Sequence, residues 1–164
     1  LHTAKKYRGL LIEEVASYDE RLMEKYLEGE NILPDEIEQL INSTTRAIMP
    51  VHINGRNADL EEIMKISNKH GIPVVEDAAQ ALGSKYKGKS LGSIANAGSI
   101  SLAPTKIITS AQGGLVLTNE KEICETIIKL KDHGRLMRKW NFHPEIGFNF
   151  KFNATFFFFN IKLN

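Results

Sequence analysis

Apolar residues recur every three or four positions in four stretches of the chain, and this spacing predicts amphipathic helices. The stretches are residues 4–28, 34–41, 60–69 and 121–132. A proline opens the second stretch, Asp59 precedes the third, and a glycine follows the first, third and fourth. These are the residue types that begin and end helices in proteins. The pattern therefore predicts four helices with defined ends.

Short apolar runs between the helical stretches predict β-strands at residues 47–52, 72–76, 100–102 and 115–118. Pro50 interrupts the first run, which indicates an edge or strand-end position because proline cannot donate to a sheet. The first two strands with the helix between them form a predicted βαβ unit, in which the strands run parallel. The sequence thus predicts an α/β fold. The Gly-, Lys- and Ser-rich stretch 86–97 is predicted to be a loop.

Composition and charge exclude several classes of protein. Lys and Arg number 21 against 20 Asp and Glu, so no excess charge favours nucleic acid or an anionic membrane as a partner. No apolar run approaches the roughly 20 residues of a membrane span. The single cysteine, Cys124, excludes an internal disulfide and fits a reducing compartment, so we expect a cytoplasmic protein. No HExxH or CxxC spacing indicates a metal site, and we interpret His52 and His133 as structural histidines.

Polar side chains stand where predicted strands end. Asp77 follows the strand at residues 72–76, and Gln80 comes one turn later. Ser101 lies in the next strand, and Lys106 follows it. Open α/β sheets bind ligands beyond the carboxyl ends of their strands, so an acid, an amide, a hydroxyl and a lysine there indicate a cofactor site. Taken alone, such an aspartate is as readily a helix cap, and such a lysine a surface residue.

The chain around these residues resembles the DegT/DnrJ/EryC1/StrS aminotransferases, pyridoxal-phosphate enzymes that aminate nucleotide-linked keto-sugars. The matching blocks are AIMPVHINGR (47–56), HGIPVVEDAAQALGSKYKGKSLGS (70–93), SLAPTKIITSAQGGLVLTN (101–119), LKDHGR (130–135) and GFNFKFN (147–153). They occur in the family's order. The resemblance implies a partial large domain of the aspartate-aminotransferase-like fold type I, here with an extra N-terminal helix.

The resemblance also implies a role for each polar residue. Lys106 is the expected catalytic residue, the Schiff-base lysine that holds pyridoxal phosphate and moves protons. Asp77 is expected to keep the pyridine nitrogen protonated, so that the ring acts as an electron sink. Gln80 is expected near the exocyclic oxygen of the ring, and Ser101 at the phosphate. Asn149 matches an asparagine that reaches the phosphate of a neighbouring subunit, which implies a homodimer.

The activity implied is transamination of a nucleotide-linked keto-sugar, with glutamate as the expected amino donor. KIITSAQGG and LKDHGR are similar to members that make 4-amino-4,6-dideoxy sugars such as perosamine. The family's N-terminal phosphate loop, its ring-stacking aromatic and its C-terminal small domain have no counterpart here. We therefore expect residues 33–153 to be an incomplete copy of the large domain. A non-catalytic fragment that keeps the fold without cofactor is the alternative.

The two ends of the chain do not resemble this family. Within a first segment of residues 1–32, residues 5–30 are similar to a helical segment of translation elongation factor G, although any amphipathic surface helix imitates part of that pattern. Residues 154–164 contain Phe156 to Phe159 and have neither a helical nor a strand period. We interpret this tail as frameshifted or foreign.

Residues 83–90 match the P-loop pattern GxxxxGK[ST], which makes a GTP-binding translation-factor piece a further alternative. A P-loop follows a strand directly and opens a helix. Here residues 77–82 intervene, and residues 91–93 are a poor helix start. The stretch 68–71 (NKHG) also lacks the aspartate of an NKxD motif. The context therefore disfavours phosphate binding by this loop.

Overall fold

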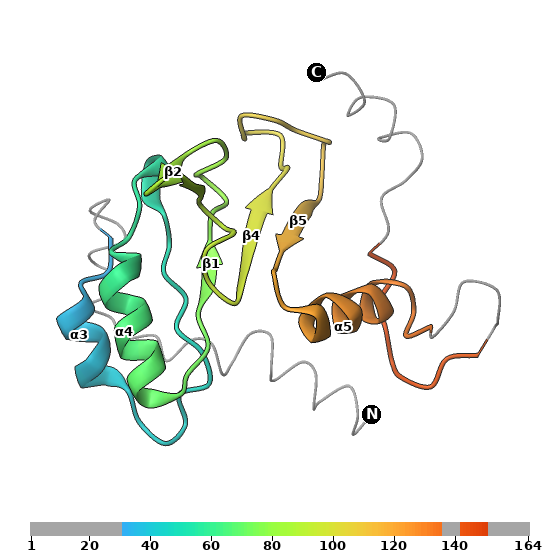
Figure 1. Ribbon diagram of the computed structural model, residues 1–164. Helices are drawn as coiled ribbons and strands as arrows, with labels where there is room; N and C mark the ends of the chain where they lie inside the picture. The colour runs from blue at the N-terminus through green and yellow to red at the C-terminus, as the bar shows by residue number, and fades with distance from the viewer. Residues whose placement is uncertain (1–30, 136–141, 151–164) are drawn as a thin grey trace.

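The structure, a computed structural model, describes residues 31–135 and 142–150 (Figure 1). The helix predicted for residues 4–28, the segment similar to elongation factor G and the tail at residues 154–164 lie outside the described residues. Those interpretations remain predictions.

Three helices appear within two residues of their predicted bounds: α3 (Pro34–Leu40), α4 (Leu60–His70) and α5 (Lys121–Lys131). Proline occupies the start of α3, as predicted. The Asp59 side chain caps α4 by accepting a hydrogen bond from the backbone N–H of Glu62 at 3.4 Å. Gly71 ends α4 with a φ of 65°, in the left-handed region that glycine adopts without strain. The local signals in the sequence thus determine these helix ends.

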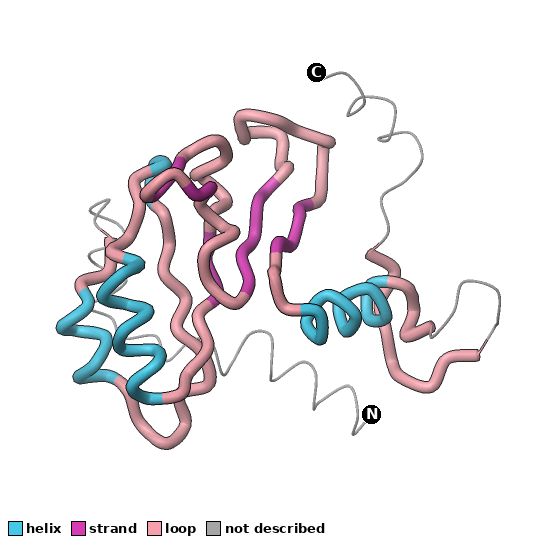
Figure 2. The backbone as a smooth tube through the Cα atoms, in the orientation of Figure 1, coloured by secondary structure: helices cyan, strands magenta, loops and turns pink. Residues whose placement is uncertain are grey.

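The central sheet contains β1 (Val75–Asp77), β4 (Ala97–Ser101) and β5 (Gly114–Leu117) in that spatial order (Figure 2). β1 and β4 are parallel, whereas β4 and β5 are antiparallel. The predicted α/β class is confirmed, and the sheet is mixed.

The strand predicted at residues 47–52 is not continuous. The segment lies beside β1 in parallel orientation through two isolated bridges, Ile48 to Val74 and Val51 to Asp77. Between them Pro50 has no N–H, although its carbonyl accepts a hydrogen bond from the N–H of Asp77 at 2.9 Å. Among the described residues this segment forms the edge next to β1, as the proline indicated. Together with α4 and β1 it forms the predicted parallel unit.

The loop predicted for residues 86–97 is wrong in its first part. Residues 85–90 form an antiparallel hairpin of β2 (Lys85–Tyr86) and β3 (Lys89–Ser90). The two turn residues, Lys87 and Gly88, have φ angles of 48° and 81°, as the tight turns of hairpins require. Because this hairpin does not open a helix, the P-loop pattern in residues 83–90 does not have P-loop geometry.

Two apolar clusters form the core. The first joins α3, α4 and the segment before β1 through Ile37, Ile48, Ile63 and Val74. The second lies between α4, β4 and the residues after β1, and it includes Leu60, Ala78, Leu91 and Ile100. α3 and α4 lie together at one end of the sheet, and α5 lies at the other (Figure 1). No helix among the described residues combines the length and apolar character that a bilayer crossing needs.

Candidate active site

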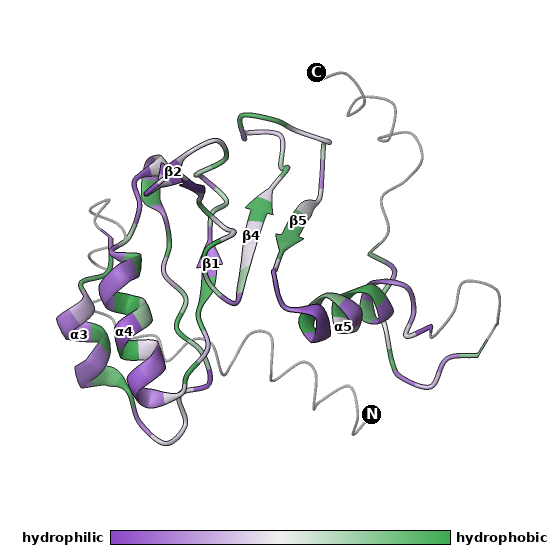
Figure 3. Ribbon diagram, in the orientation of Figure 1, coloured by the Kyte–Doolittle hydropathy of each residue, from purple (hydrophilic) through white to green (hydrophobic). Residues whose placement is uncertain are grey.

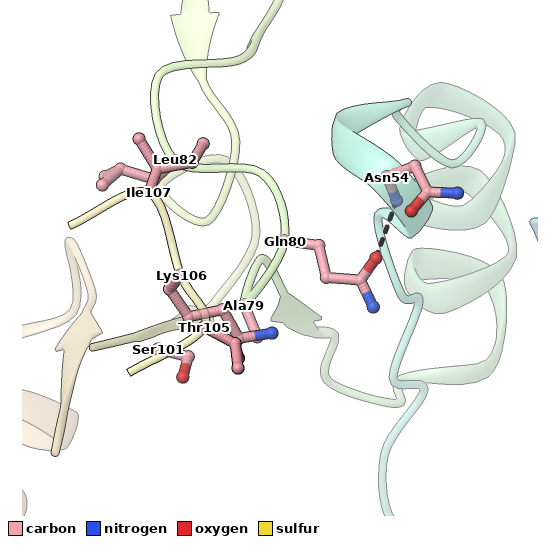
Figure 4. A pocket seen from close by; sticks show the side chains of 8 residues that line it. All are labelled: Asn54, Ala79, Gln80, Leu82, Ser101, Thr105, Lys106 and Ile107. Carbon is pink, nitrogen blue, oxygen red and sulfur yellow. Dashed lines mark hydrogen bonds between the residues drawn. The ribbon is translucent and has the colours of Figure 1, made fainter. Parts of the chain in front are cut away.

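A cavity of about 380 Å³ lies beyond the carboxyl ends of β1 and β4. Eight residues line it: Asn54, Ala79, Gln80, Leu82, Ser101, Thr105, Lys106 and Ile107 (Figure 4). They include Gln80, Ser101 and Lys106, three of the five residues that the sequence singled out. The predicted location beyond the strand ends is therefore the location of a cavity.

Lys106 lies in the loop that connects β4 to β5. Its backbone N–H donates to the carbonyl of Ala103 at 3.0 Å, which forms a turn directly after β4. Hydrogen bonds from Leu102 to the carbonyl of Gly113 at 2.9 Å, and from Ser110 to the carbonyl of Leu102 at 3.1 Å, close the base of the loop. The half-buried lysine side chain is thereby held at the cavity.

Two hydroxyl groups lie on the same side as the lysine. Ser101 is the last residue of β4, and its Oγ accepts from the backbone N–H of Ala103 at 3.3 Å. A serine hydroxyl that accepts one hydrogen bond still has a proton to donate. Thr105 also lines the cavity, but no motif in the sequence had indicated it. Its position directly before Lys106 was the available signal.

Gln80 enters the cavity from the segment after β1. Its Oε1 accepts a hydrogen bond from the backbone N–H of Asn54 at 2.9 Å (Figure 4). Asn54 belongs to a 3₁₀ turn, Ile53–Gly55, that the sequence analysis did not identify. The pair Asn54–Gly55 was the missed signal, because Asn-Gly sequences favour turns with positive φ.

Asp77 is close to the cavity but does not line it. It ends β1, and its Oδ1 accepts from the backbone N–H of Ala79 at 2.9 Å. Ala79 does line the cavity. The carboxylate therefore shapes the turn that carries the cavity wall; turns rather than a helix follow it, so it does not act as the helix cap that the sequence left open.

Asn149 is not brought to the cavity. It is exposed and forms an antiparallel bridge with Asp132, just beyond the end of α5. The two backbone segments lie very close together beside this bridge, since a Cβ on Gly147 would lie 1.9 Å from the nitrogen of Gly134. A role for Asn149 at a neighbouring subunit remains a prediction.

The acid next to Asp77 has a structural function that the sequence analysis missed. The side chain of Glu76 is fully buried and accepts from the backbone N–H groups of Gly92, Ile94 and Ala95 at 2.7–2.8 Å. Burial acts to raise the pKa of the Glu76 carboxyl, but hydrogen bonds from His52 and from these N–H groups outweigh it and lower the pKa. Glu76 thus holds the turn at residues 91–95 against β1 as an anion.

The interpretation of His52 as a structural histidine is confirmed. It is fully buried, and its Nδ1 accepts from the backbone N–H of Ala58 at 3.2 Å. The ring proton is therefore on Nε2, which lies 3.0 Å from Oε2 of Glu76. Nδ1 thus binds the ring to the loop between the Ile53–Gly55 turn and α4, and Nε2 binds it to β1.

Comparison with known proteins identifies the origin of this arrangement. Residues 27–156 match the model of the DegT/DnrJ/EryC1/StrS aminotransferase family. The chain is 37% identical to GDP-perosamine synthase of Escherichia coli O157:H7 over 116 residues, which are 71% of the chain and 32% of the relative. It is 36% identical to L-glutamine:2-deoxy-scyllo-inosose aminotransferase of Streptomyces fradiae over 106 residues, covering 65% of the chain and 25% of the relative.

The fold resembles Helicobacter pylori PseC, an aminotransferase involved in the biosynthesis of pseudoaminic acid. The TM-score is 0.70 at 35% identity, over 74% of this chain and 33% of that one. The chain therefore spans about a third of the length of the relatives it matches.

Proposed function

This chain belongs to the DegT/DnrJ/EryC1/StrS aminotransferase family, and we propose that it carries the cofactor-binding part of a sugar-nucleotide aminotransferase. The enzymes of this family depend on pyridoxal phosphate. The observation that carries the proposal is the cavity in which Lys106, Ser101 and Gln80 meet. All three belong to sequence blocks that match the family, and they reach the cavity from two different strand ends.

The groups at the cavity fit pyridoxal phosphate. The cofactor has an aldehyde, a ring hydroxyl and a phosphate, which suit an amine, an amide and hydroxyl donors respectively. Lys106 would hold it covalently and move protons, while Ser101 and Thr105 would donate to its phosphate. Gln80 would donate to the ring oxygen, and Asp77 would keep the ring nitrogen protonated. Bound there, the cofactor supplies an electron sink.

The proposed reaction is amino transfer to a nucleotide-linked keto-sugar, yielding a 4-amino-4,6-dideoxy sugar. The similarity to a perosamine synthase supports this substrate class. We propose glutamate as the amino donor, although a relative of nearly equal identity is named for glutamine. We also propose a cytoplasmic homodimer in which Asn149 reaches the partner's phosphate site. Assays of the two donors with a keto-sugar nucleotide test the reaction, and sedimentation tests the dimer.

The first test of the proposal is covalent trapping. The chain is mixed with pyridoxal phosphate, reduced with borohydride, and mapped by peptide mass. We expect one stoichiometric adduct on Lys106, and we expect Lys106→Arg to abolish it and Asp77→Ala to reduce it strongly. The exposed hairpin residues Lys85 and Lys89 are internal controls for unspecific reaction. Adducts spread over such lysines, or no adduct, would instead favour a non-catalytic fragment.

A further inference from the structure

Asn54 has an unusual backbone conformation at the edge of the cavity. Its φ and ψ are 52° and 31°, and Gly55 follows with a φ of 78°. Non-glycine residues seldom adopt this left-handed region, and asparagine tolerates it best. The N–H of Gly55 donates to the carbonyl of His52 at 3.3 Å, and Asn31 accepts from the N–H of Ile53 at 3.2 Å. The turn is therefore held in one conformation from both sides.

This turn determines which way the Gln80 amide points. The two ends of a glutamine amide are an acceptor oxygen and a donor NH₂ group, and a backbone N–H can only donate. The atom 2.9 Å from the nitrogen of Asn54 is therefore the Gln80 oxygen. The Asn54 side chain points away from Gln80 (Figure 4). Only the backbone of Asn54 makes the contact, and the two donors of Gln80 are left to serve a ligand.

The turn is also packed against the segment that carries Gln80. A Cβ placed on Gly55 would lie 3.0 Å from Oγ of Ser84 and 3.5 Å from the backbone oxygen of Gln80. Behind the turn, His52 is buried and is joined to Glu76 on β1. A change at the turn therefore acts on Gln80 directly, while the sheet keeps its own support.

We propose that Asn54 is a positioning residue: its left-handed backbone directs an N–H at Gln80 and so presents the Gln80 NH₂ group as a donor to an oxygen of the ligand. This inference rests on the proposed function for the identity of that ligand, pyridoxal phosphate. It assigns to Asn54 a role that depends on backbone conformation and involves no contact of its side chain with Gln80.

Substitutions that differ in their preference for positive φ distinguish the positioning of Gln80 from a general contribution of Asn54 to stability. Asn54→Val disfavours positive φ because valine is β-branched, whereas Asn54→Gly retains both the N–H and the conformation. The matched control is Lys87→Val, since Lys87 and Gly88 have φ angles of 48° and 81° in a turn that does not line the cavity. We expect Asn54→Val to weaken pyridoxal phosphate binding roughly three- to tenfold, the range for one hydrogen bond. Asn54→Gly and Lys87→Val should stay within about twofold.

A double-mutant cycle tests whether Asn54 acts through Gln80. In a Gln80→Ala background, Asn54→Val should have no further effect on the dissociation constant. An equal loss in both backgrounds would overturn the proposal, and so would an Asn54→Gly variant that binds as weakly as Asn54→Val. Thermal unfolding of each variant without cofactor checks that Asn54→Val and Lys87→Val are folded to the same extent.

Failure of the positioning role can be distinguished from failure of the proposed function, because the order of the Gln80 side chain can be measured without cofactor. In ¹⁵N NMR spectra we expect a side-chain NH₂ order parameter typical of a fixed group in the parent chain and in Lys87→Val. In Asn54→Val it should fall to that of a free glutamine side chain. That result supports the positioning role even if Lys106 takes up no pyridoxal phosphate. A Gln80 NH₂ group that Asn54→Val leaves unchanged would overturn it.

Discussion

Helices α4 and α5 have the same length of 11 residues and a similar amphipathic pattern (Figure 3), yet they are buried to different extents. α4 buries Leu60, Ile63 and Ser67, whereas α5 has no buried residue. An apolar stripe therefore predicts a helix and the face that turns inward, but the presence of a partner element decides whether that face is buried. Among the described residues, α4 contributes to both apolar core clusters, with α3 and β4 as partners, whereas no residue of α5 belongs to either cluster.

The difference extends to the parts of the sheet that the two helices adjoin. Around α4 and β1 even the polar core residues Glu76 and His52 have hydrogen-bond partners. On β5 and α5 the apolar side chains Leu115, Val116 and Ile128 are 41%, 54% and 52% exposed. We call these the Glu76 region (residues 47–101) and the α5 region (residues 102–135). These exposed apolar side chains form a surface that the described residues leave largely uncovered.

The largest expected effect comes from removing the anion at the centre of the Glu76 region. Glu76→Ala leaves His52 and three backbone N–H groups buried without their acceptor. We expect the free energy of unfolding to fall by about 3–5 kcal/mol, since each buried donor that loses its acceptor costs roughly 1–3 kcal/mol. Urea unfolding followed by circular dichroism measures it. Glu62→Ala, which removes an exposed pair with Lys65, is the control and should change stability by less than about 1 kcal/mol.

A matched pair of isoleucines tests the two helices directly. Ile63 is fully buried on α4, and Ile128 is 52% exposed on α5. Ile63→Ala should cost about 2–5 kcal/mol of unfolding free energy through lost burial and a cavity. Ile128→Ala should cost less than about 0.5 kcal/mol. Comparable losses from both substitutions would show that the apolar face of α5 is covered in solution.

A glycine inside the Glu76 region tests how closely its backbone is packed. A Cβ on Gly98 would lie 2.1 Å from the carbonyl oxygen of Gly92, so β4 or the turn at residues 91–95 must move. We expect Gly98→Ala to lower stability by about 1–3 kcal/mol. Gly71→Ala, where a Cβ meets nothing within 4 Å but φ is 65°, should cost about 1 kcal/mol. Equal effects of the two substitutions would contradict the close contact.

The smallest effect is a pH dependence confined to mild acid. The folded state lowers the pKa of Glu76 below its ordinary 4.5, so its carboxylate contributes stability above pH 4.5 that is lost as pH falls through the lower folded value. Glu38 and Glu61 also have lowered pKa values, chiefly through hydrogen bonds to Lys69 and Lys87 respectively, but these pairs lie at the surface. High salt screens such surface pairs. We therefore expect a loss of stability below pH 4.5 that persists in 0.5 M salt, an ionic strength at which the Debye length is only about 4 Å.

Much of the site could be predicted from sequence blocks, because Gln80, Ser101 and Lys106 stand at fixed offsets from strand ends. Thr105 and Asn54 were missed, since a threonine beside a lysine and an Asn-Gly turn carry no chemistry until the cavity brings them together. The hairpin at residues 85–90 was missed for another reason. Its strands are two residues long and largely charged or polar, so no alternation of apolar residues predicts them.

The sequence by itself determined the features that depend on neighbours along the chain: the helix ends at Pro34, Asp59 and Gly71, and the edge position of Pro50. Capping and loss of an N–H act within a few residues, so local pattern suffices. Only the tertiary structure decided that Glu76 is the buried anion and that Asn54 contacts Gln80, 26 residues away. Such contacts depend on which segments pack together, and the residue pattern of one segment does not identify the distant segment that it contacts.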